Sequence, residues 1–527
     1  MREKPPSLPV WGCHLPHWKD IALSAMWHQN LRLRGVWAAR SEAFIAPPIK
    51  RDDLDRLKQK KITHQTAKMV GPQASWRRLL SLAVACFVAP KLVSASLQIV
   101  PGATWTATNT GLHVQAHGGS ITYSNGLYYL IGENHQNGSA FQAITCYSSP
   151  DLVQWTFVNN LLSLQASGDL GPSRVVERPK ILYNAATAKW VMWMHIDSSS
   201  YGEAKVGVAT SSSICGAYTY ISSWQPLGFQ SRDMSLFQDT NGSAYLLTED
   251  RANGLRIDAL SSNYLNVTSA TYLYAQDYEA PAMIKSNGVY FMFASHESGW
   301  TSNDNIYCTA TSLTGPWSAW QTFAPAGTNT YNSQTAFILQ VGSNFMYMGD
   351  RWVSTNLMAS TYIWLPLTIS GTTASMPTNY VNWVVNVSTG AMGAGPSETT
   401  YEGEAAALAG GALVVSCSGC SGAEAAGWLG GSSGGTATFS SISSTVSTKT
   451  TIRIKYQNGD TTARFGSVSV NGGTAQQVAF LPLADGATPV SSVVHVQLNS
   501  GSSNTFKIAG VNGGYVADID RLMVPVS

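Results

Sequence analysis

The sequence predicts an all-β protein: a five-bladed β-propeller followed by a jelly-roll type β-sandwich. Charged residues make up only 12% of the chain, whereas Gly, Ser, Thr and aromatic residues are abundant. This composition suits half-buried strands joined by tight turns. A turn-and-strand pattern recurs five times between residues 97 and 388, and shorter alternating strands rich in Gly, Ser, Ala and Val follow it. No amphipathic helix of useful length interrupts either part.

The five copies of the repeat are short aromatic strands, each entered through a turn. They are NGLYYLIGE (125–133), AKWVMWMH (188–195), GSAYLLTED (242–250), NGVYFMFASH (287–296) and SNFMYMGD (343–350). An outer strand with its own signal follows each copy, as in SSPDLVQWT (148–156). A repeat of paired inner and outer strands at this period predicts four-stranded propeller blades over residues 97–388.

The composition changes after the last repeat. Residues 389–400 are small and flexible, which predicts a linker. Residues 401–527 contain short alternating strands such as TIRIKY (451–456) and VVHVQL (493–498), separated by Gly-rich turns. This second region is predicted to be the β-sandwich.

The segment from Met69 to Ser96 has the three parts of a secretory signal peptide. Arg77 and Arg78 form a basic patch, residues 79–89 form an apolar run too short to span a bilayer, and small residues lie around position 95. We therefore interpret Met69 as the start, residues 1–68 as a gene-model extension, and the mature protein as secreted and extracellular. The alternative is a signal anchor of an inverted-topology membrane protein.

Secretion is consistent with the glycosylation sequons and with cysteine usage. Four Asn-x-Ser/Thr sequons follow the predicted cleavage point, at Asn137, Asn241, Asn266 and Asn386. Five of the seven cysteines also follow it. Two pairs could form disulfides and leave Cys308 free, although spacing alone does not prove the pairing: Cys146 with Cys215, and Cys417 with Cys420.

The charge balance excludes two classes of partner. Residues 97–527 contain 16 Lys and Arg but 24 Asp and Glu, a net charge of −8. Such a surface gains no counterion release from nucleic acid or anionic membranes, so neither is an expected partner. No Cys or His spacing suggests zinc, no cofactor is expected for catalysis, and the protein is expected to be a monomer.

Three acids in the repeat region suit glycosidic bond hydrolysis. That reaction requires a protonated carboxyl for the leaving oxygen and a second group that directs water from the opposite face. Glu279 in YEAP, Asp233 in SRDMS and Glu177 in VVERPK are the candidates. Taken alone, Glu177 could equally pair with a neighbouring Arg or Lys on the surface, and Asp233 could cap a turn.

Eight stretches in order along the chain resemble glycoside hydrolase family 43, and within it the exo-β-1,3-galactanases. They are QAHGG (115–119), SSPDLVQW (148–155), SRVVERPKI (173–181), SRDMSLFQD (231–239), YEAPAMI (278–284), ASHESGW (294–300), YNSQTAF (331–337) and YMGDRW (347–352). The resemblance implies that Glu279 is the general acid, that Asp233 raises its pKa, and that Glu177 contacts the substrate. It also implies that Glu133 and Tyr201 hold the terminal galactose.

Three more residues are candidates for sugar contact. Glu297 falls where the resembling subgroup has a polar contact, although a threonine is expected there. Trp300 and Trp352 could stack on sugar faces, or they could simply pack within the propeller.

The first blade lacks the aspartate with which most members of the larger family activate water. No Asp or Glu lies between Leu97 and Gly132, and QAHGG occupies the corresponding place. This departure matches the galactanase subgroup. The resemblance implies that Gln334 acts as an unusual base through its imidic-acid tautomer or positions the water, and Glu177 is the ordinary alternative base. His117 is expected to shape the pocket.

The C-terminal region resembles a family 35 carbohydrate-binding module through YEGEAAAL (401–408) and GYVADIDRL (514–522). Glu402, Glu404 and Asp520 are the expected ligands of Ca²⁺, which prefers oxygen donors. Tyr515 and Asp518 resemble the ligand-contacting pair of galactan-binding members, and Asp460 or Arg464 could add to them.

The function expected from the sequence is that of a secreted exo-β-1,3-galactanase. It would act on the β-1,3-galactan main chain of arabinogalactan from the non-reducing end, with inversion, and release galactose or β-1,6-branched units. The alternatives are another family 43 activity (α-L-arabinofuranosidase or β-xylosidase) and a catalytically inactive galactan-binding protein.

Overall fold

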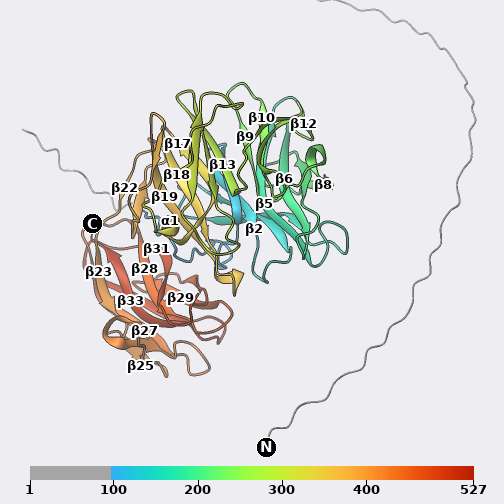
Figure 1. Cartoon of the computed structure of the whole chain (residues 1–527). Coiled ribbons are helices and arrows are strands. Elements are labelled where there is room, and N and C mark those ends of the chain that lie inside the picture. Colours follow the sequence, from blue (N-terminus) through green and yellow to red (C-terminus); the bar gives the residue numbers. More distant parts are fainter. Residues whose placement is uncertain (1–96, 527) are drawn as a thin grey trace, which may run out of the picture. The chain divides into compact units, whose positions relative to one another are not determined.

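The computed structural model describes residues 97–526 and consists almost entirely of antiparallel strands (Figure 1). The predicted extension (1–68) and signal peptide (69–96) lie outside the described residues. One short α-helix, α1 (Asn329–Asn332), and three 3₁₀ turns occur among the described residues: η2 (Pro226–Gly228), η3 (Leu357–Ala359) and η4 (Ser421–Ala423). None of the helices in this part of the chain has the length and apolar character needed to cross a membrane.

The first twenty strands form five sheets of four consecutive strands each. Blade 1 contains β1 (His117–Ser124), β2 (Leu127–Glu133), β3 (Ala143–Ser149) and β4 (Thr156–Ser163). Blade 2 contains β5 (Arg174–Asn184), β6 (Lys189–Ser198), β7 (Lys205–Ser211) and β8 (Thr219–Trp224). Blade 3 contains β9 (Met234–Gln238), β10 (Ala244–Asp250), β11 (Gly254–Leu260) and β12 (Val267–Leu273).

Blade 4 contains β13 (Glu279–Ser286), β14 (Val289–Ser295), β15 (Ile306–Ala310) and β16 (Gln321–Thr322). Blade 5 contains β17 (Gln334–Val341), β18 (Asn344–Arg351), β19 (Thr361–Ser370) and β20 (Thr373–Ser375). The first strands contact one another in a closed ring, in the order β1, β5, β9, β13, β17 and back to β1. The predicted five-bladed propeller is confirmed.

The aromatic repeat strands form the core of the blades because they are buried on both faces. The repeated aromatic segments become β2, β6, β10, β14 and β18, each the second strand of its sheet. Trp193, Phe291, Phe293 and Tyr347, which lie on these strands, have at most 1% of their surface exposed. Burying such side chains from water is the main stabilising contribution of each blade.

The C-terminal strands form two antiparallel sheets. One contains β23 (Glu398–Glu402), β25 (Leu413–Ser416), β26 (Glu424–Gly427), β28 (Lys449–Gln457), β31 (Val490–Gln497) and β33 (Asp518–Pro525). The other contains β24 (Ala407–Ala409), β27 (Thr436–Ser444), β29 (Arg464–Val470), β30 (Gln476–Phe480) and β32 (Gly501–Gly510). Ile454 and Leu522 from the first sheet share one hydrophobic cluster with Phe506 and Ile508 from the second. Two sheets over one core are the arrangement of a β-sandwich, and the jelly-roll topology stays a prediction.

The predicted linker (389–400) differs from the expectation, because it contains regular structure. β22 (Met392–Ala394) pairs with β21 (Trp383–Val385), and β23 already begins at Glu398. The Glu398 carboxylate forms an ion pair with Arg453 of β28. Small residues therefore do not leave this segment unpaired, since the backbone hydrogen bonds of a hairpin need no particular side chains.

Both suggested disulfides are present in the structure. Cys146 is bonded to Cys215 and Cys417 to Cys420, whereas Cys308 is free and buried. The first bond joins β3 to the segment that follows β7, so it links blades 1 and 2.

Candidate active site

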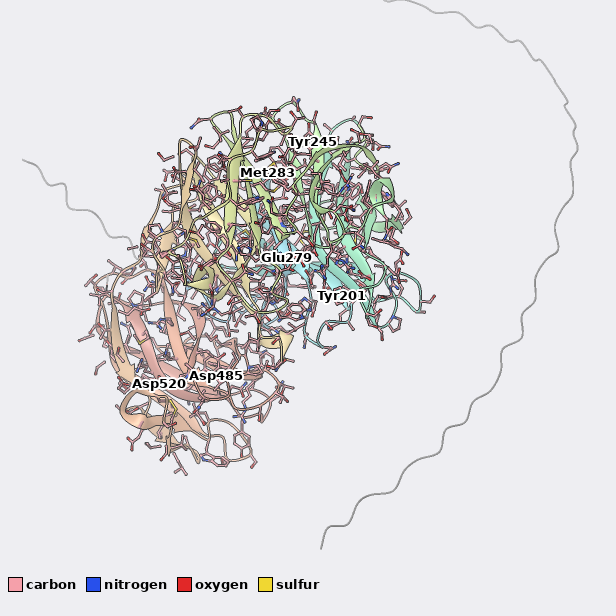
Figure 2. The ribbon with its side chains drawn as sticks, in the orientation of Figure 1. Tyr201, Tyr245, Glu279, Met283, Asp485 and Asp520 are labelled. Atoms are coloured by element: carbon pink, nitrogen blue, oxygen red, sulfur yellow. A yellow bond between two sulfur atoms is a disulfide. The ribbon has the colours of Figure 1, made fainter. Side chains whose placement is uncertain are left out.

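Each blade contributes one equivalent pair of positions to a single cluster at one end of the propeller. The first member lies at the start of the inner strand, and the second lies opposite it on the next strand. The register pairs are His117 with Glu133, Glu177 with His195, Glu279 with Ser295, and Gln334 with Asp350. In blade 3, the Glu249 N–H donates to the Asp233 carbonyl (2.9 Å) just before β9. Figure 2 shows Glu279 and Tyr201 near this end of the propeller, with Met283 farther along β13.

A cavity of about 210 Å³ occupies the centre of this cluster. Eight of the eleven residues for which the sequence predicts a catalytic or sugar-binding role line it. The lining side chains are Glu133, Glu177, Arg178, His195, Tyr201, Arg232, Asp233, Glu249, Arg251, Glu279, Gly299, Trp300, Gln334 and Trp352. Five carboxyl groups, three guanidinium groups and two tryptophans are therefore among the groups that line the pocket.

A β-bulge at the start of the inner strand aims these side chains inward. The register shifts directly after His117, Glu177 and Glu279. The next residue adopts a positive φ in each case: Gly118 (57°), Arg178 (54°) and Ala280 (55°). Bulges of this kind are frequent beside active sites because they redirect a side chain, and a non-glycine residue in this region carries a strain of about 1–3 kcal/mol. The strain recurs at the same position in blades 2 and 4.

The glycine at position 118 is required by a close approach. A Cβ atom there would lie 2.0 Å from Glu133 Oε1, so only glycine leaves room for this carboxylate. His117 itself is fully buried, and its Nδ1 is 2.9 Å from Asp350 Oδ1. Its ring stacks on Tyr362 and does not line the cavity. These contacts are consistent with the expectation that His117 shapes the pocket.

Glu279 is placed as a proton donor would have to be. Glu279 is 7% exposed. Its burial is the largest cause that raises its pKa to about 9, and the negative charges of the Asp233 and Glu249 carboxylates act in the same direction. Asp233 Oδ2 accepts the backbone N–H of Ala280 (3.1 Å) and forms an ion pair with Arg178 (2.9 Å). A neighbouring anion disfavours ionisation of a carboxyl, so Asp233 acts on Glu279 in the direction that the sequence analysis expects.

Gln334 is held by four hydrogen bonds. Its Oε1 accepts from Arg178 Nη2 (2.5 Å) and Trp352 Nε1 (2.9 Å). Its Nε2 donates to Glu279 Oε1 (2.8 Å) and Ser295 Oγ (3.2 Å). An imidic acid carries a proton on oxygen, yet guanidinium and indole groups can only donate. These neighbours therefore stabilise the amide form of Gln334 and not the imidic-acid tautomer.

Glu177 accepts hydrogen bonds on both oxygens and keeps capacity for more. Tyr201 Oη donates to Oε1 (2.6 Å), and His195 Nδ1 lies 3.2 Å from Oε2. Burial favours a higher pKa for Glu177, but the hydrogen bonds from His195 and Tyr201 outweigh it and lower the pKa. Each carboxylate oxygen has roughly two lone-pair sites, so one on each oxygen is free. The surface ion pair considered for Glu177 is absent, since the residue is 8% exposed and forms no ion pair with Arg178 or Lys180.

Sequence reasoning missed several residues of the pocket. Burial and Asp233 raise the pKa of Glu249 to about 8, although Arg251 acts in the opposite direction. Arg251 Nη2 lies 2.6 Å from Glu249 Oε1 and 4.0 Å from Glu279 Oε2. The signal that could have found Glu249 and His195 is their position, because each lies near the end of a repeated aromatic strand, as the predicted Glu133 does.

The two tryptophans lie at the pocket and contact each other edge to face at 5.1 Å. Trp300 is 36% exposed and is free to meet a sugar ring, whereas Trp352 is also tied to Gln334. Glu297 does not line the cavity. It lies 3.3 Å from Arg251 and close to the carboxylate of Glu249, two residues that do line the cavity.

Two sets of three acidic or histidine side chains in the pocket lie close enough together to bind a cation. A third set lies at the rim of the pocket. The three sets are Glu177, His195 and Asp233; Asp233, Glu249 and Glu279; and Glu249, Asp277 and Glu297. Protein donors already engage the first two groups, including Tyr201, Arg178 and Gln334. The structure gives no reason to assign a metal to the catalytic pocket.

The sandwich presents a separate aromatic surface. Tyr515 is 43% exposed and meets Trp428, which is 55% exposed, edge to face at 5.8 Å. Burial raises the pKa of Asp518, while Arg464 acts in the opposite direction. Arg464 also pairs with Asp460 (2.7 Å) and donates to the Val516 carbonyl. Trp428 was not predicted from the sequence, and its neighbourhood of Gly residues carries no motif that would have identified it.

The three predicted calcium ligands converge on the turn η4. Ser421 N–H donates to Asp520 Oδ1 (2.9 Å), and Ser421 Oγ donates to Glu402 Oε1 (3.3 Å). Glu402 Oε2 and Glu404 Oε2 are buried and have no hydrogen-bond partner among the described residues. Burial, together with the Glu404 and Asp520 carboxylates, raises the pKa of Glu402 even though Arg521 lowers it. Buried carboxylate oxygens without a partner fit a bound cation.

The chain is similar to known proteins over both of its regions. Residues 108–344 match the family model described as glycosyl hydrolases family 43. Residues 436–524 match a model described as the CBM13 domain of alpha-galactosidase. This description differs from family 35, the carbohydrate-binding family that the sequence analysis expects. No curated protein sequence matches the chain.

Solved structures give the stronger match. The exo-β-1,3-galactanase of Phanerochaete chrysosporium is 42% identical, with 81% of this chain and 99% of that chain covered and a TM-score of 0.58. A putative exo-β-1,3-galactanase of Bifidobacterium bifidum is 34% identical over 53% of this chain and 97% of that chain, with a TM-score of 0.51. The exo-β-1,3-galactanase of Clostridium thermocellum is 26% identical, with 76% of this chain and 100% of that chain covered and a TM-score of 0.54. The chain belongs to glycosyl hydrolase family 43, and it is a glycoside hydrolase.

Proposed function

We propose that this enzyme is a secreted, monomeric exo-β-1,3-galactanase. It removes galactose, or galactose bearing β-1,6-linked branches, from the non-reducing ends of β-1,3-galactan chains of arabinogalactan, with inversion. The observation that carries the proposal is the Glu279–Gln334 pair beside Asp233 in the pocket, together with the first blade, in which buried His117 occupies the place where a catalytic aspartate would otherwise lie. The solved structures of the Phanerochaete enzyme with galactose and with β-1,3-galactotriose support the substrate class.

The pocket supports an acid-assisted displacement. With a terminal galactosyl unit in the cavity, protonated Glu279 donates its proton to the glycosidic oxygen as the C–O bond breaks. Asp233 keeps Glu279 protonated at neutral pH by its negative charge. Water attacks the opposite face and loses its proton to a carboxylate, which gives a hemiacetal of inverted configuration.

Glu177 is the better candidate for the proton acceptor. The hydrogen-bonding positions of Gln334 are occupied, whereas both oxygens of Glu177 retain a free lone pair. Gln334 then acts by orienting Glu279, to which its amide donates a hydrogen bond. The role of base, which the sequence resemblance gives to Gln334, therefore passes in this proposal to the carboxylate that the sequence analysis kept as its alternative.

One assay tests the proposal. The enzyme is incubated with β-1,3-galactan, and the first product is followed by proton NMR before mutarotation. Galactose released as the α-anomer is the expected result. Release of the β-anomer contradicts inversion, hydrolysis confined to arabinofuranosides or xylosides moves the specificity to another family 43 activity, and no hydrolysis with retained binding indicates an inactive galactan-binding protein.

Secretion is supported by the two disulfides and by the sequons. Disulfides persist in oxidising compartments, and Asn137, Asn241, Asn266 and Asn386 are all exposed. N-terminal sequencing of the secreted protein should begin near Leu97. A start well before Leu97 contradicts the assignment of Met69 as the first residue and of residues 69–96 as a signal peptide.

The sandwich is proposed to be a galactan-binding module, of family 35 as its sequence suggests, that uses Tyr515, Asp518 and Trp428. Replacing Tyr515 by alanine should weaken binding of the full-length enzyme to insoluble β-1,3-galactan by about tenfold, because an exposed aromatic face contributes on the order of 1 kcal/mol or more. Turnover of a soluble galactotriose should not change. Tyr123, an exposed tyrosine on the propeller, offers a matched control through Tyr123→Ala; equal loss in both variants contradicts the assignment.

Calcium is proposed to bind Glu402, Glu404 and Asp520. Calcium at 100 times its Kd should stabilise the module by about 2.7 kcal/mol, and a chelator should remove this gain. Calorimetry of the wild type and of Glu404→Gln checks the expectation, with magnesium as the control because it dehydrates less readily. Unchanged unfolding temperatures with calcium and with chelator contradict the site.

A further inference from the structure

Two buried histidines lie directly behind the substrate-facing carboxylates Glu133 and Glu177. His195 is 1% exposed and His135 is 3% exposed. His195 comes from β6 in blade 2, and His135 follows β2 in blade 1. Neither residue carries out a step in the proposed mechanism, yet each hydrogen bonds a pocket carboxylate.

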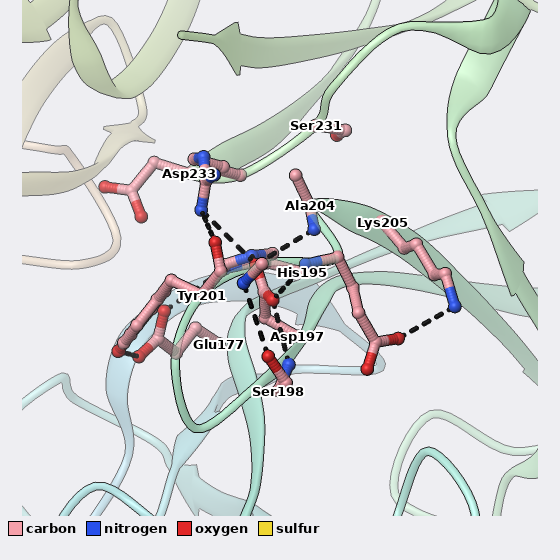
Figure 3. Close-up of polar contacts among 12 residues, drawn as sticks. Glu177, His195, Asp197, Ser198, Tyr201, Ala204, Lys205, Ser231 and Asp233 are labelled. Carbon is pink, nitrogen blue, oxygen red and sulfur yellow. Dashed lines mark hydrogen bonds and ion pairs between the residues drawn. The ribbon is translucent and has the colours of Figure 1, made fainter. Parts of the chain in front are cut away.

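His195 has a carboxylate on each side (Figure 3). Its Nδ1 lies 3.2 Å from Glu177 Oε2, and its Nε2 lies 3.1 Å from Asp197 Oδ2. Asp197 also accepts backbone N–H groups from Ser198, Glu203 and Ala204, which favours its ionised form. An ionised carboxylate can only accept hydrogen bonds, so both ring nitrogens of His195 must carry protons. The ring is then an imidazolium cation.

His135 shows the same pattern. Its Nε2 lies 2.7 Å from Glu133 Oε2, and its Nδ1 lies 3.0 Å from the Gly138 carbonyl oxygen, which is only an acceptor. The other oxygen of Glu133 accepts the backbone N–H of Arg178 (2.8 Å). Both oxygens of Glu133 therefore accept a hydrogen bond, and both ring nitrogens of His135 donate one.

The other buried histidines of blade 1 provide a contrast. Neither ring nitrogen of His113 has a hydrogen-bond partner among the described residues. Burial, and to a smaller degree the nearby His117, lowers the pKa of His113 to about 4. His117 binds Asp350 through Nδ1, while its Nε2 is without a partner. Burial without a hydrogen-bond partner thus lowers the pKa of His113, whereas two acceptors distinguish His135 and His195.

We propose that His135 and His195 are imidazolium cations at neutral pH, and that they hold Glu133 and Glu177 ionised in the pocket, where both can accept hydrogen bonds from the bound sugar and Glu177 can also accept the proton of the attacking water. They are positioning residues, since each acts through a carboxylate. The proposal rests on the galactanase function for its substrate. The carboxylates of the pocket then have two different roles. Glu133 and Glu177, each hydrogen bonded to an imidazolium, accept hydrogen bonds, whereas Glu279, which has no imidazolium partner, stays protonated.

The surrounding charges favour the cationic rings. Burial lowers the pKa of each ring, but hydrogen bonds and charges from the carboxylates outweigh it and raise the pKa of His135 to about 8 and of His195 to about 9. His195 faces Glu177, Tyr201, Asp197, Arg232, Asp233 and Glu249. His135 faces Glu133, Glu177, His117 and Trp352. Because both pKa values are raised, the cations are complete at neutral pH and are lost as the pH rises through these values.

Neutron diffraction from deuterated crystals of the full-length wild type at about pH 7 tests the charge directly. Deuterium on both ring nitrogens of His135 and of His195 is expected, with at most one on His113. A neutral ring at either site overturns the proposal for that residue. This measurement involves no substrate, so its outcome is separate from that of the proposed function.

Kinetics test the consequence. In His135→Gln and His195→Gln, KM for a soluble β-1,3-galactan oligosaccharide should rise about 10- to 100-fold, because a charge-assisted hydrogen bond is lost. In His135→Gln kcat should change less, whereas in His195→Gln kcat should also fall, because Glu177 is the proposed proton acceptor. In the wild type KM should rise above about pH 8, and His135→Gln should lack this rise. His113→Gln is the matched control and should keep the wild-type profile. Equal losses in all three variants, or an unchanged KM in the first two, contradict the proposal.

Discussion

Replacing Glu279 by glutamine is expected to lower kcat on β-1,3-galactan by about 100- to 10,000-fold, the range that general acid catalysis contributes. Glutamine keeps the size of the side chain and its contact with Gln334, but it has no proton to give to the leaving oxygen. The affinity for galactan should therefore stay within a few fold of that of the wild type. Initial rates and calorimetric binding of galactotriose give the two quantities.

The leaving group provides the sharpest control for this variant. An aryl β-galactoside with an acidic phenol departs without full protonation, so its hydrolysis should suffer much less than that of galactan. Glu424→Gln, a replacement at the exposed first residue of β26 in the sandwich, controls for the effect of exchanging Glu for Gln anywhere in the chain. A Glu279→Gln variant with near-normal turnover of galactan overturns the assignment of the acid.

The pH dependence follows from the same group. Burial and the neighbouring Asp233 and Glu249 carboxylates raise the pKa of Glu279 to about 9. The protonated form is the active one, so on the alkaline side kcat should fall as the pH rises through this value, while protonation of the proposed base Glu177 limits kcat only at acid pH. In Asp233→Asn one negative charge is lost, and the alkaline limit of kcat should move to lower pH. A limit that stays in place contradicts the role of Asp233 as a modulator.

Glu177→Ala is expected to lose more activity than Gln334→Ala. Removal of a base lowers kcat by about 100- to 10,000-fold, whereas loss of a residue that orients its neighbours should have a smaller effect. The reason is the contact pattern of Gln334, whose oxygen faces two donors that cannot take up a proton. Steady-state rates of both variants on galactotriose provide the comparison.

Added azide separates the two roles further. A small anionic nucleophile needs no base, so azide should restore activity to Glu177→Ala and form a galactosyl azide of inverted configuration. It should not restore Gln334→Ala, in which the geometry around Glu279 is disturbed. Rescue of Gln334→Ala alone, or a Glu177→Ala variant of normal activity, assigns the base to Gln334.

Hydrophobic patterning alone was enough to predict the propeller. Five aromatic strands at a regular spacing cannot bury their side chains individually, and packing them as consecutive blades removes all of them from water. The linker prediction failed for a related reason. Small residues at 389–400 gave no apolar pattern, yet β22 and the start of β23 form there through backbone pairing.

The sequence by itself determined the succession of blades and the pairing partners available to the cysteines, which follow from residue types and local patterns. Its resemblance to a known family singled out Glu279, Asp233 and Glu177 as the candidates for catalysis. Only the tertiary structure decided which donors face Gln334, that His135 and His195 lie behind Glu133 and Glu177, and that Glu249 and Arg251 complete the pocket. The physical reason is that proton positions and pKa values depend on contacts between different blades, which distance along the chain does not specify.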